Sequence, residues 1–257
     1  MVTGFARLFV ILVVLFLYLP VFVTVIFSFS TSPRLSLPVE GLTLHWYRTA
    51  LDNPQMAAAL RNSLILAVGT SLLSGLIGCA CSFGILAQKS ARLRRGLLAF
   101  SLLPAVVPLL VTGIALAVMF HALGLSQGLR NAMLGHVLVC LPFVILTMNA
   151  RLQNFDFSVL EAARDLGASR LRAFLDITLP LIRPSLIGAC LLAAALSLDE
   201  FVVTWFNIGN QQTVPVLVWG LMRRGVDPSI NAVATALFVL LVTLVVASNL
   251  IGRRGTR

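Results

Sequence analysis

The sequence contains little charge. Only 11% of its 257 residues are Asp, Glu, Lys or Arg, while 59% are apolar. Soluble globular domains carry about 25% charged residues, so this composition excludes an ordinary soluble domain and indicates a membrane protein. The net charge of +10 would fit a nucleic-acid binder, but most basic residues flank long apolar runs, where they anchor helices at lipid headgroups. We therefore expect a lipid membrane as a partner and no nucleic acid.

Residues that carry bond chemistry are also scarce. No segment matches G-x-x-x-x-G-K-[ST], the phosphate-binding loop of many ATPases. The three histidines are scattered, are expected in loops or at interfaces, and belong to no Ser-His-Asp or Cys-His constellation: His45, His121 and His136. The four cysteines fall in predicted helices, where a thiol behaves as a small apolar group: Cys79, Cys81, Cys140 and Cys190. We expect no catalytic residue, metal or cofactor in this chain, and no enzyme activity of its own.

Six long runs without charge predict transmembrane helices. A helix needs about 20 apolar residues to cross a hydrocarbon layer about 30 Å thick, and the runs lack the alternation typical of barrel strands. The predicted spans are about 8–29, 62–87, 97–120, 131–150, 185–207 and 229–251. The first run is too long for the apolar core of a signal peptide, which predicts an uncleaved anchor. The fold class is therefore an all-α membrane protein with a single transmembrane domain, 1–257.

The basic residues predict the orientation of these spans. Lys and Arg near the ends of spans are retained on the cytoplasmic side. Most of the nineteen basic residues fall at the N-terminus, in the clusters 89–95 and 151–183, and in the tail 253–257. These segments all lie on one side if the chain starts inside. We therefore predict that both termini are cytoplasmic.

A polar segment, 151–184, separates the fourth and fifth predicted spans and is much longer than the other basic loop. Its centre is predicted to form a short helix, with Ser158 as the cap, Glu161 as the capping-box partner and Gly167 at the end. A second short helix, 170–178, has an apolar side and is predicted to end before a proline. Two short helices joined by a glycine would form a compact knob beneath the membrane.

Two further features lie within the predicted spans. Pro104 and Pro108 stand one turn apart in the third span, so this helix should be kinked or locally unwound, as helices that line transport routes often are. Asp199 and Glu200 lie in the fifth, where a charge is costly and is by default functional. Adjacent helical residues point about 100° apart, so one acid can face a translocation path while the other meets a neighbouring helix. The alternative is that the pair marks the outer interface of the membrane.

The knob resembles a known family. Glu161-Ala162-Ala163, Gly167, Ile177, Leu179 and Pro180 are similar to the E-A-A loop of permease subunits of type I ABC importers. In that family the loop is a coupling helix that seats in a cleft of the ATP-hydrolysing subunit. The resemblance implies that Glu161 caps and forms salt bridges, that the alanines allow close approach and that Gly167 provides the turn. The residues it assigns to ATPase coupling are Glu161, Ala162, Ala163, Asp165, Gly167, Leu179 and Pro180.

The stretch 197–204, Thr213-Val214-Pro215 and the segment 231–235 are similar to the spermidine/putrescine branch of these permeases. This resemblance implies a substrate path that includes Trp46, Ser197, Asp199 and Glu200. One position departs from the branch, because Leu109 stands where polyamine permeases often have an acid after the second proline of the third span. The alternatives are the same machinery importing another small organic solute, such as an amino-acid-like or cationic compound, and, more distantly, an ion-coupled secondary carrier.

The family resemblance also implies partners and a location. We expect a homologous second permease, two ATP-binding cassette subunits that bind ATP and Mg, and an extracytoplasmic solute-binding protein. The expected location is the bacterial inner membrane, as a multi-pass protein with the type I importer permease fold.

Overall fold

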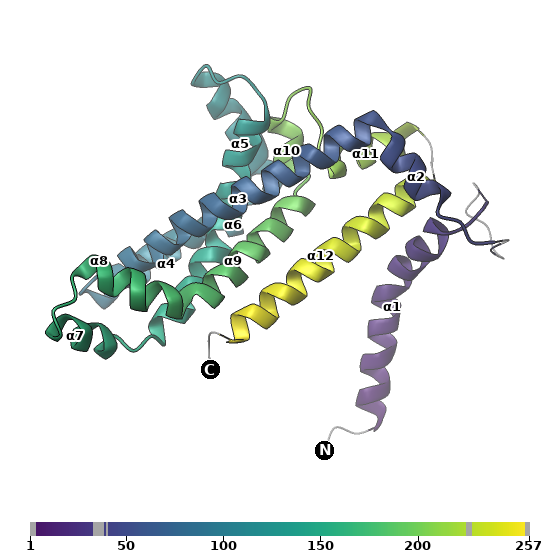
Figure 1. Cartoon of the computed structure of the whole chain (residues 1–257). Helices are drawn as coiled ribbons and strands as arrows, with labels where there is room; N and C mark the ends of the chain where they lie inside the picture. Colours follow the sequence, from purple (N-terminus) through teal and green to yellow (C-terminus); the bar gives the residue numbers. More distant parts are fainter. Residues whose placement is uncertain (1–3, 33–38, 40, 225–227, 255–257) are drawn as a thin grey trace. The chain divides into compact units, whose positions relative to one another are not determined.

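The computed structural model is built almost wholly of helices. It describes residues 4–32, 39, 41–224 and 228–254. Across these ranges the only β feature is an isolated bridge between Ser30 and Leu42. The chain divides into two compact units, Met1–Ala58 with Leu217–Leu240 and Ala59–Val216 with Leu241–Arg257, and each is described by itself (Figure 1). The single predicted domain, 1–257, stays a prediction.

Helices long and apolar enough to cross a membrane account for most of the chain. Within the residues that the structure describes, five do so as continuous helices, and a sixth candidate is a bent pair of helices. The five are Ala6–Ser28, Pro54–Leu86, Leu129–Gln153, Arg170–Asp199 and Ser229–Ile251. They lie in α1 (Gly4–Ser28), α3 (Pro54–Leu86), α6 (Leu129–Gln153), α8 with α9 (Arg170–Ala173, Leu179–Asp199) and α12 (Ser229–Arg254). The predicted all-α class is confirmed.

The bent pair is the predicted third span, 97–120, which is not one helix. α4 (Ala91–Val106) and α5 (Leu109–Ala122) meet at an angle of 96°. Pro104 lies inside α4, whereas Pro108 stands directly before α5, and Val107 before it has an extended backbone. Because proline lacks an N–H and disfavours helix in the residue before it, the break falls at Val107 and Pro108. The predicted interruption of this span is confirmed at Pro108.

The helix that carries the predicted fifth span, 185–207, differs from it at both ends, and the bounds of the span in a membrane stay a prediction. Its helix begins at Arg170, so the stretch 170–178 is not a separate helix that ends before Pro180. A π-helical turn, Phe174–Thr178, joins α8 to α9, and the Leu179 N–H donates to the Phe174 carbonyl five residues back. This wider turn directly precedes Pro180, whose ring would press on the carbonyl four residues earlier in a regular α-helix. At the other end α9 stops at Asp199, and a separate short helix, α10 (Val202–Asn207), follows.

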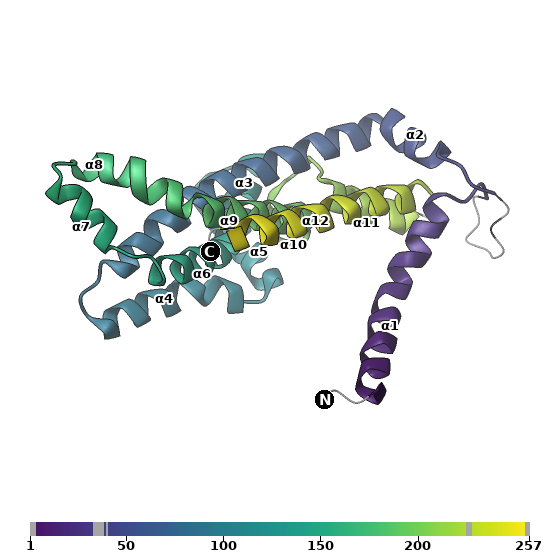
Figure 2. The same ribbon diagram turned by 60° about the horizontal axis from the view of Figure 1, so that its bottom comes forward.

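The core of the larger unit lies between α6 and α9. Large side chains from both helices are almost fully buried there, including Val144, Met148, Leu152 and Ile182. Small residues allow the close packing: a Cβ placed on Gly78 of α3 would lie 2.6 Å from the Val144 side chain. In Figures 1 and 2, α7 (Ser158–Asp165) and α8 lie at one end of this unit, and α5 and α10 lie towards the opposite end. The two predicted functional regions therefore occupy opposite ends of the same helices.

The smaller unit includes α1, α2 (His45–Asp52), the first residues of α3 and the segment Leu217–Leu240, which holds most of α11 (Val214–Arg224). Most of the span Ala6–Ser28 is exposed within this chain, and its buried residues, Phe27 and Ser28, lie at its end. At its end the Ser28 hydroxyl and the Tyr47 hydroxyl are 2.8 Å apart, and the Trp46 indole N–H donates to the Ser30 carbonyl at 2.7 Å. Helix α2 is thus fastened to the end of α1 by two polar contacts.

Candidate functional site: an exposed helical turn and a broken helix

The start of α7 depends on an acid rather than on the predicted serine cap. The N-cap residue is Phe157, which makes no side-chain cap. Instead Asp156 Oδ1 accepts a hydrogen bond from the Ser158 N–H at 3.0 Å. Hydrogen bonds from the Ser158 side chain and from its backbone N–H lower the pKa of the Asp156 carboxyl below its ordinary value. The predicted capping box of Ser158 and Glu161 is wrong, because Asp156 already satisfies the first free N–H.

The end of α7 is a Schellman motif built around Gly167. The Ala168 N–H donates to the Ala163 carbonyl at 3.0 Å, and the Gly167 N–H donates to the Arg164 carbonyl at 2.9 Å. Gly167 has φ +87, a conformation that costs a residue with a Cβ about 1–2 kcal/mol. The Ser169 hydroxyl then accepts from the Arg172 N–H at 3.3 Å and starts α8. The predicted turn at Gly167 is confirmed as a turn.

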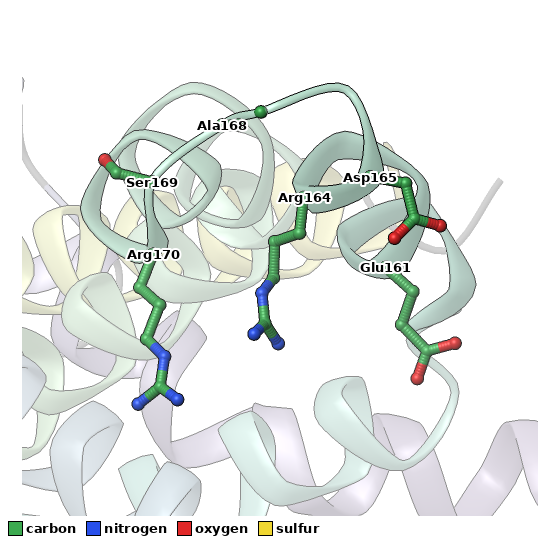
Figure 3. Close-up of a pocket in the computed structure, with 7 residues that line it drawn as sticks. Glu161, Arg164, Asp165, Ala168, Ser169 and Arg170 are labelled. Atoms are coloured by element: carbon green, nitrogen blue, oxygen red, sulfur yellow. The ribbon is translucent and has the colours of Figure 1, made fainter.

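An open groove of about 650 Å³ lies along this turn. Its lining residues are Glu161, Arg164, Asp165, Gly167, Ala168, Ser169 and Arg170. Figure 3 shows the Arg164 and Arg170 guanidinium groups extending to the same side of the turn, with Glu161 beside them. Among the described residues, none forms a salt bridge with Glu161 or Asp165, so the groove presents charges of both signs to its surroundings.

Apolar side chains accompany these charges. α7, Ser158–Asp165, has no buried residue, and Leu166 directly after it is 90% exposed. Leu166 also lines a second hollow of about 350 Å³ on the turn, with Ala163, Arg172 and Ile177 among its neighbours. The turn therefore offers a partner both an apolar side chain and charges. The sequence reasoning missed Leu166, although its place between Asp165 and Gly167, at the end of a short polar helix, was a signal.

Only part of the predicted coupling set meets at the groove. Glu161, Asp165 and Gly167 line it, whereas Ala162 is exposed and Ala163 half-buried nearby. Leu179 packs against the α6–α9 core, and Pro180 lies beside it at the start of α9. The last two residues therefore shape the base of the α8–α9 helix and do not line the groove.

The second region is the break between α9 and α10, where the two acids separate. Asp199 is the last residue of α9 and is exposed, while Glu200 is only 8% exposed. The Glu200 carboxylate accepts a hydrogen bond from the Val203 N–H at 2.8 Å and so satisfies a free donor at the start of α10. Glu200 is also the C-cap residue of α9, and its backbone is extended. The hydrogen bond to the Val203 N–H therefore gives a physical reason for the end of α9. Glu200 is engaged within the chain, and Asp199 is not buried.

His136 adds a polar connection at this break that sequence reasoning did not find. The histidine is 0% exposed within α6, so its expected place in a loop or at an interface is wrong. Its Nδ1 lies 2.7 Å from the Ser197 hydroxyl, and its Nε2 lies 2.7 Å from the Thr204 hydroxyl. Ser197, assigned to the substrate path by resemblance, is therefore buried and bound to a neighbouring helix. The position of His136 in the middle of an apolar run was the available signal, since polar groups at membrane depth are costly.

The remaining predicted residues lie elsewhere. Trp46 belongs to the smaller unit, where its indole N–H is occupied by Ser30. Leu109 is the first residue of α5 and is 39% exposed, so the position that departs from the polyamine branch does reach the surface of the chain. In the part of the chain that the structure describes, no three His, Cys, Asp or Glu side chains come together as metal ligands.

Comparisons with known proteins connect these regions to a family. The family model described as binding-protein-dependent transport system inner membrane component matches residues 80–254. The chain is 35% identical over 245 residues to the spermidine/putrescine transport system permease protein PotC of Escherichia coli (strain K12), covering 94% of this chain and 91% of the relative. It is 36% identical over 227 residues to the putrescine transport system permease protein PotI of the same strain, covering 86% and 80%.

Solved structures agree on the fold. A chain of a bacterial ABC transporter involved in the import of alginate superposes with a TM-score of 0.72 at 17% identity, covering 98% of this chain and 96% of that one. A chain of the inward-facing MetNI methionine ABC transporter gives 0.60 at 18% identity, covering 80% and 100%. The predicted permease fold is confirmed, and the family match spans both the exposed turn and the broken helix. The chain belongs to the family of inner membrane components of binding-protein-dependent transport systems.

Proposed function

We propose that this chain is the membrane-spanning permease subunit of an ATP-driven importer whose solutes are polyamines. The observation that carries the solute class is the 35% identity, over 94% of the chain, to a permease named for spermidine and putrescine. The proposed assembly contains a homologous second permease, two ATP-binding cassette subunits that bind ATP and Mg, and an extracytoplasmic solute-binding protein. It lies in the bacterial inner membrane, with both termini of this chain in the cytoplasm.

The groove along α7 and α8 is the proposed contact with the ATPase. An apolar Leu166 that is 90% exposed, the Glu161 carboxylate and the Arg164 and Arg170 guanidinium groups offer a partner both apolar area and charge. Helix-in-groove recognition combines such elements. The helix from Arg170 to Asp199 has 30 residues, which corresponds to a rod of about 45 Å. Closure of the ATPases on ATP would move the base of this rod, and the rod would carry the motion to the broken end and turn the pore outward.

Asp199 is the proposed contact for a cationic solute. It is exposed, whereas Glu200 next to it is buried and caps α10. A carboxylate and an ammonium group form a charge-assisted hydrogen bond, which is about twice as strong as a neutral one. Trp46 remains in the proposed path, and Ser197 is proposed to affect transport indirectly, through its hydrogen bond to His136.

A second candidate solute is a small organic molecule with fewer positive charges. The observation that favours it is Leu109, an exposed leucine in place of the acid that polyamine permeases often have there. Each additional charge on a solute needs a partner in a low-dielectric path. Calorimetry of the cognate binding protein against putrescine, spermidine and 4-aminobutyrate separates the two. Heat of binding with either polyamine supports the first candidate, and binding of 4-aminobutyrate alone overturns it.

The proposed ATPase contact has its own test in a matched pair of variants. Leu166 follows α7 and Leu123 follows α5 as the C-cap residue of the same type of motif, and both are exposed. Leu166→Ser should reduce co-purification of the ATP-binding cassette subunits with the permease, while Leu123→Ser should leave it at the wild-type level. If both variants retain the same amount of ATPase, the groove is not part of the interface with the ATPase.

A further inference from the structure

A buried chain of polar groups ties α6 to both sides of the break between α9 and α10. Ser197 belongs to α9, Thr204 to α10 and His136 to α6. His136 and Thr204 are 0% exposed and Ser197 is 3% exposed. The Thr204 hydroxyl also donates to the Glu200 carbonyl at 2.8 Å. Every buried hydroxyl and ring nitrogen of this chain of groups therefore has a partner, as buried polar atoms require.

The direction of these hydrogen bonds follows from counting hydrogens. Thr204 has one hydroxyl hydrogen, and it is committed to the Glu200 carbonyl. Thr204 must therefore accept from His136, so Nε2 carries a hydrogen. In the neutral imidazole Nδ1 is then the acceptor, and the Ser197 hydroxyl donates to it. The result is one ordered series from Ser197 through His136 and Thr204 to the backbone of Glu200.

The two hydrogen bonds of His136 fit the broken helix better than a continuous one. Ser197 and Thr204 are seven residues apart, and in one continuous α-helix they would lie on the same face roughly 10 Å apart along the axis. Two hydrogen bonds of 2.7 Å and the width of one imidazole ring fall short of that separation. A single histidine can reach both hydroxyls because α9 ends at Asp199 and α10 begins at Val202.

We infer that His136 is a positioning residue: it fixes the α9–α10 break, keeps Asp199 exposed at the end of α9, and is the group through which Ser197 affects transport. Ser197 acts on the imidazole and does not contact the solute. The part of this inference that concerns transport rests on the proposed function. The part that concerns the break does not, because it can be measured with no solute present.

The first test reads the position of residue 199 directly. In the full importer, with the four native cysteines replaced, Asp199→Cys serves as a reporter for an impermeant maleimide. His136→Leu removes both hydrogen bonds and should lower the alkylation rate of this reporter by about fivefold to 30-fold, the population change expected when two buried hydrogen bonds are lost. A second reporter, Lys89→Cys, is exposed in the loop between α3 and α4 and should not respond in the detergent-solubilised importer. His121→Leu, which removes an exposed histidine, should alter neither rate.

The second test asks whether Ser197 works through His136. Ser197→Ala should lower solute uptake in the wild-type background and cause no further loss in the His136→Leu background. Independent losses that multiply would mean that Ser197 contacts the solute itself, and would overturn the inference. If His136→Leu does not assemble, Thr204→Val and Thr204→Ser make the same comparison: the serine keeps the hydroxyl and should preserve the Asp199→Cys alkylation rate, while the valine should change it.

The two proposals fail in different ways. An importer that takes up no polyamine would end the proposed function, but the alkylation result would still stand. An alkylation rate at residue 199 that is the same in the wild type, His136→Leu and Thr204→Val would overturn the positioning role, whatever solute is transported.

Discussion

Replacing Gly167 by alanine should uncouple ATP hydrolysis from transport while leaving the membrane helices intact. Gly167 has φ +87, and a Cβ added there would meet nothing within 4 Å. The penalty is therefore one of backbone conformation alone, about 1–2 kcal/mol for a residue with a Cβ. α7 has no buried residue to hold the strained turn in place. A penalty of this size changes the population of the native turn by about 5- to 30-fold.

Gly124 provides a matched control at the opposite end of the same unit. It has φ +70, and a Cβ there would also meet nothing within 4 Å. It ends α5 with the same two hydrogen bonds, from the Gly124 N–H to the His121 carbonyl and from the Leu125 N–H to the Phe120 carbonyl. Gly124→Ala therefore imposes the same local penalty without touching the groove along α7 and α8.

The assay is ATP hydrolysis by the purified importer in proteoliposomes, with and without the solute-loaded binding protein. Gly167→Ala should lose most of the stimulation by the binding protein, and Gly124→Ala should keep it. Both variants should be recovered from membranes in similar amounts, because their local penalties match. Wild-type stimulation in Gly167→Ala, or an equal loss in Gly124→Ala, would refute the reasoning.

Three further substitutions test other parts of the structure. Asp199→Asn should reduce the apparent affinity for a polyamine in uptake by about tenfold or more, as expected for loss of a hydrogen bond to a charged group, whereas Asp52→Asn, another exposed acid, should not; equal effects would argue against a solute contact. Asp156→Ala should weaken ATPase stimulation by the same factor across about pH 6 to 8. The pKa of the Asp156 carboxyl lies below its ordinary value, so the carboxylate caps α7 throughout this range and stops doing so only when the pH falls through the lowered pKa. A factor that varies within this range would contradict the assignment. Gly135→Ala would place a Cβ 2.5 Å from the Val203 side chain and should lower the free energy of unfolding by about 1–3 kcal/mol, measured by thermal unfolding. Gly96→Ala, where a Cβ meets nothing within 4 Å, should not lower it.

The sequence was sufficient where one strong local signal decides the structure. Long uncharged runs located the membrane helices, since a run of about 20 apolar residues is long enough to cross a bilayer. Pro108 indicated the interruption of the third span, and Gly167 indicated the turn after α7 because only glycine adopts its backbone angles without strain. Ser158 and Gly167 likewise indicated where a short helix begins and ends, and the observed helix is Ser158–Asp165, although Ser158 does not cap it.

The errors came from tertiary contacts that local patterns do not contain. The helix of the fifth span was expected to begin after Arg183, where the uncharged run starts. A π-helical turn instead lets the helix run through Pro180. It was expected to continue to 207, but Glu200 caps α10 and ends α9. His136 was expected in a loop or at an interface because its two partners, Ser197 and Thr204, lie 61 and 68 residues away in the chain and do not show in the local pattern. Such pairings become visible only when the helices are packed.

The most direct test of the proposed function is ATP-dependent uptake by the reconstituted importer, with this chain, its second permease, the ATPase subunits and the binding protein. Labelled putrescine and spermidine should accumulate in proteoliposomes when ATP is enclosed, and Gly167→Ala should abolish most of that uptake while Gly124→Ala sustains it. Accumulation of 4-aminobutyrate without either polyamine would contradict the solute class. Polyamine uptake that continues without ATP or without the ATPase subunits would contradict the claim that this chain is a partner-driven permease.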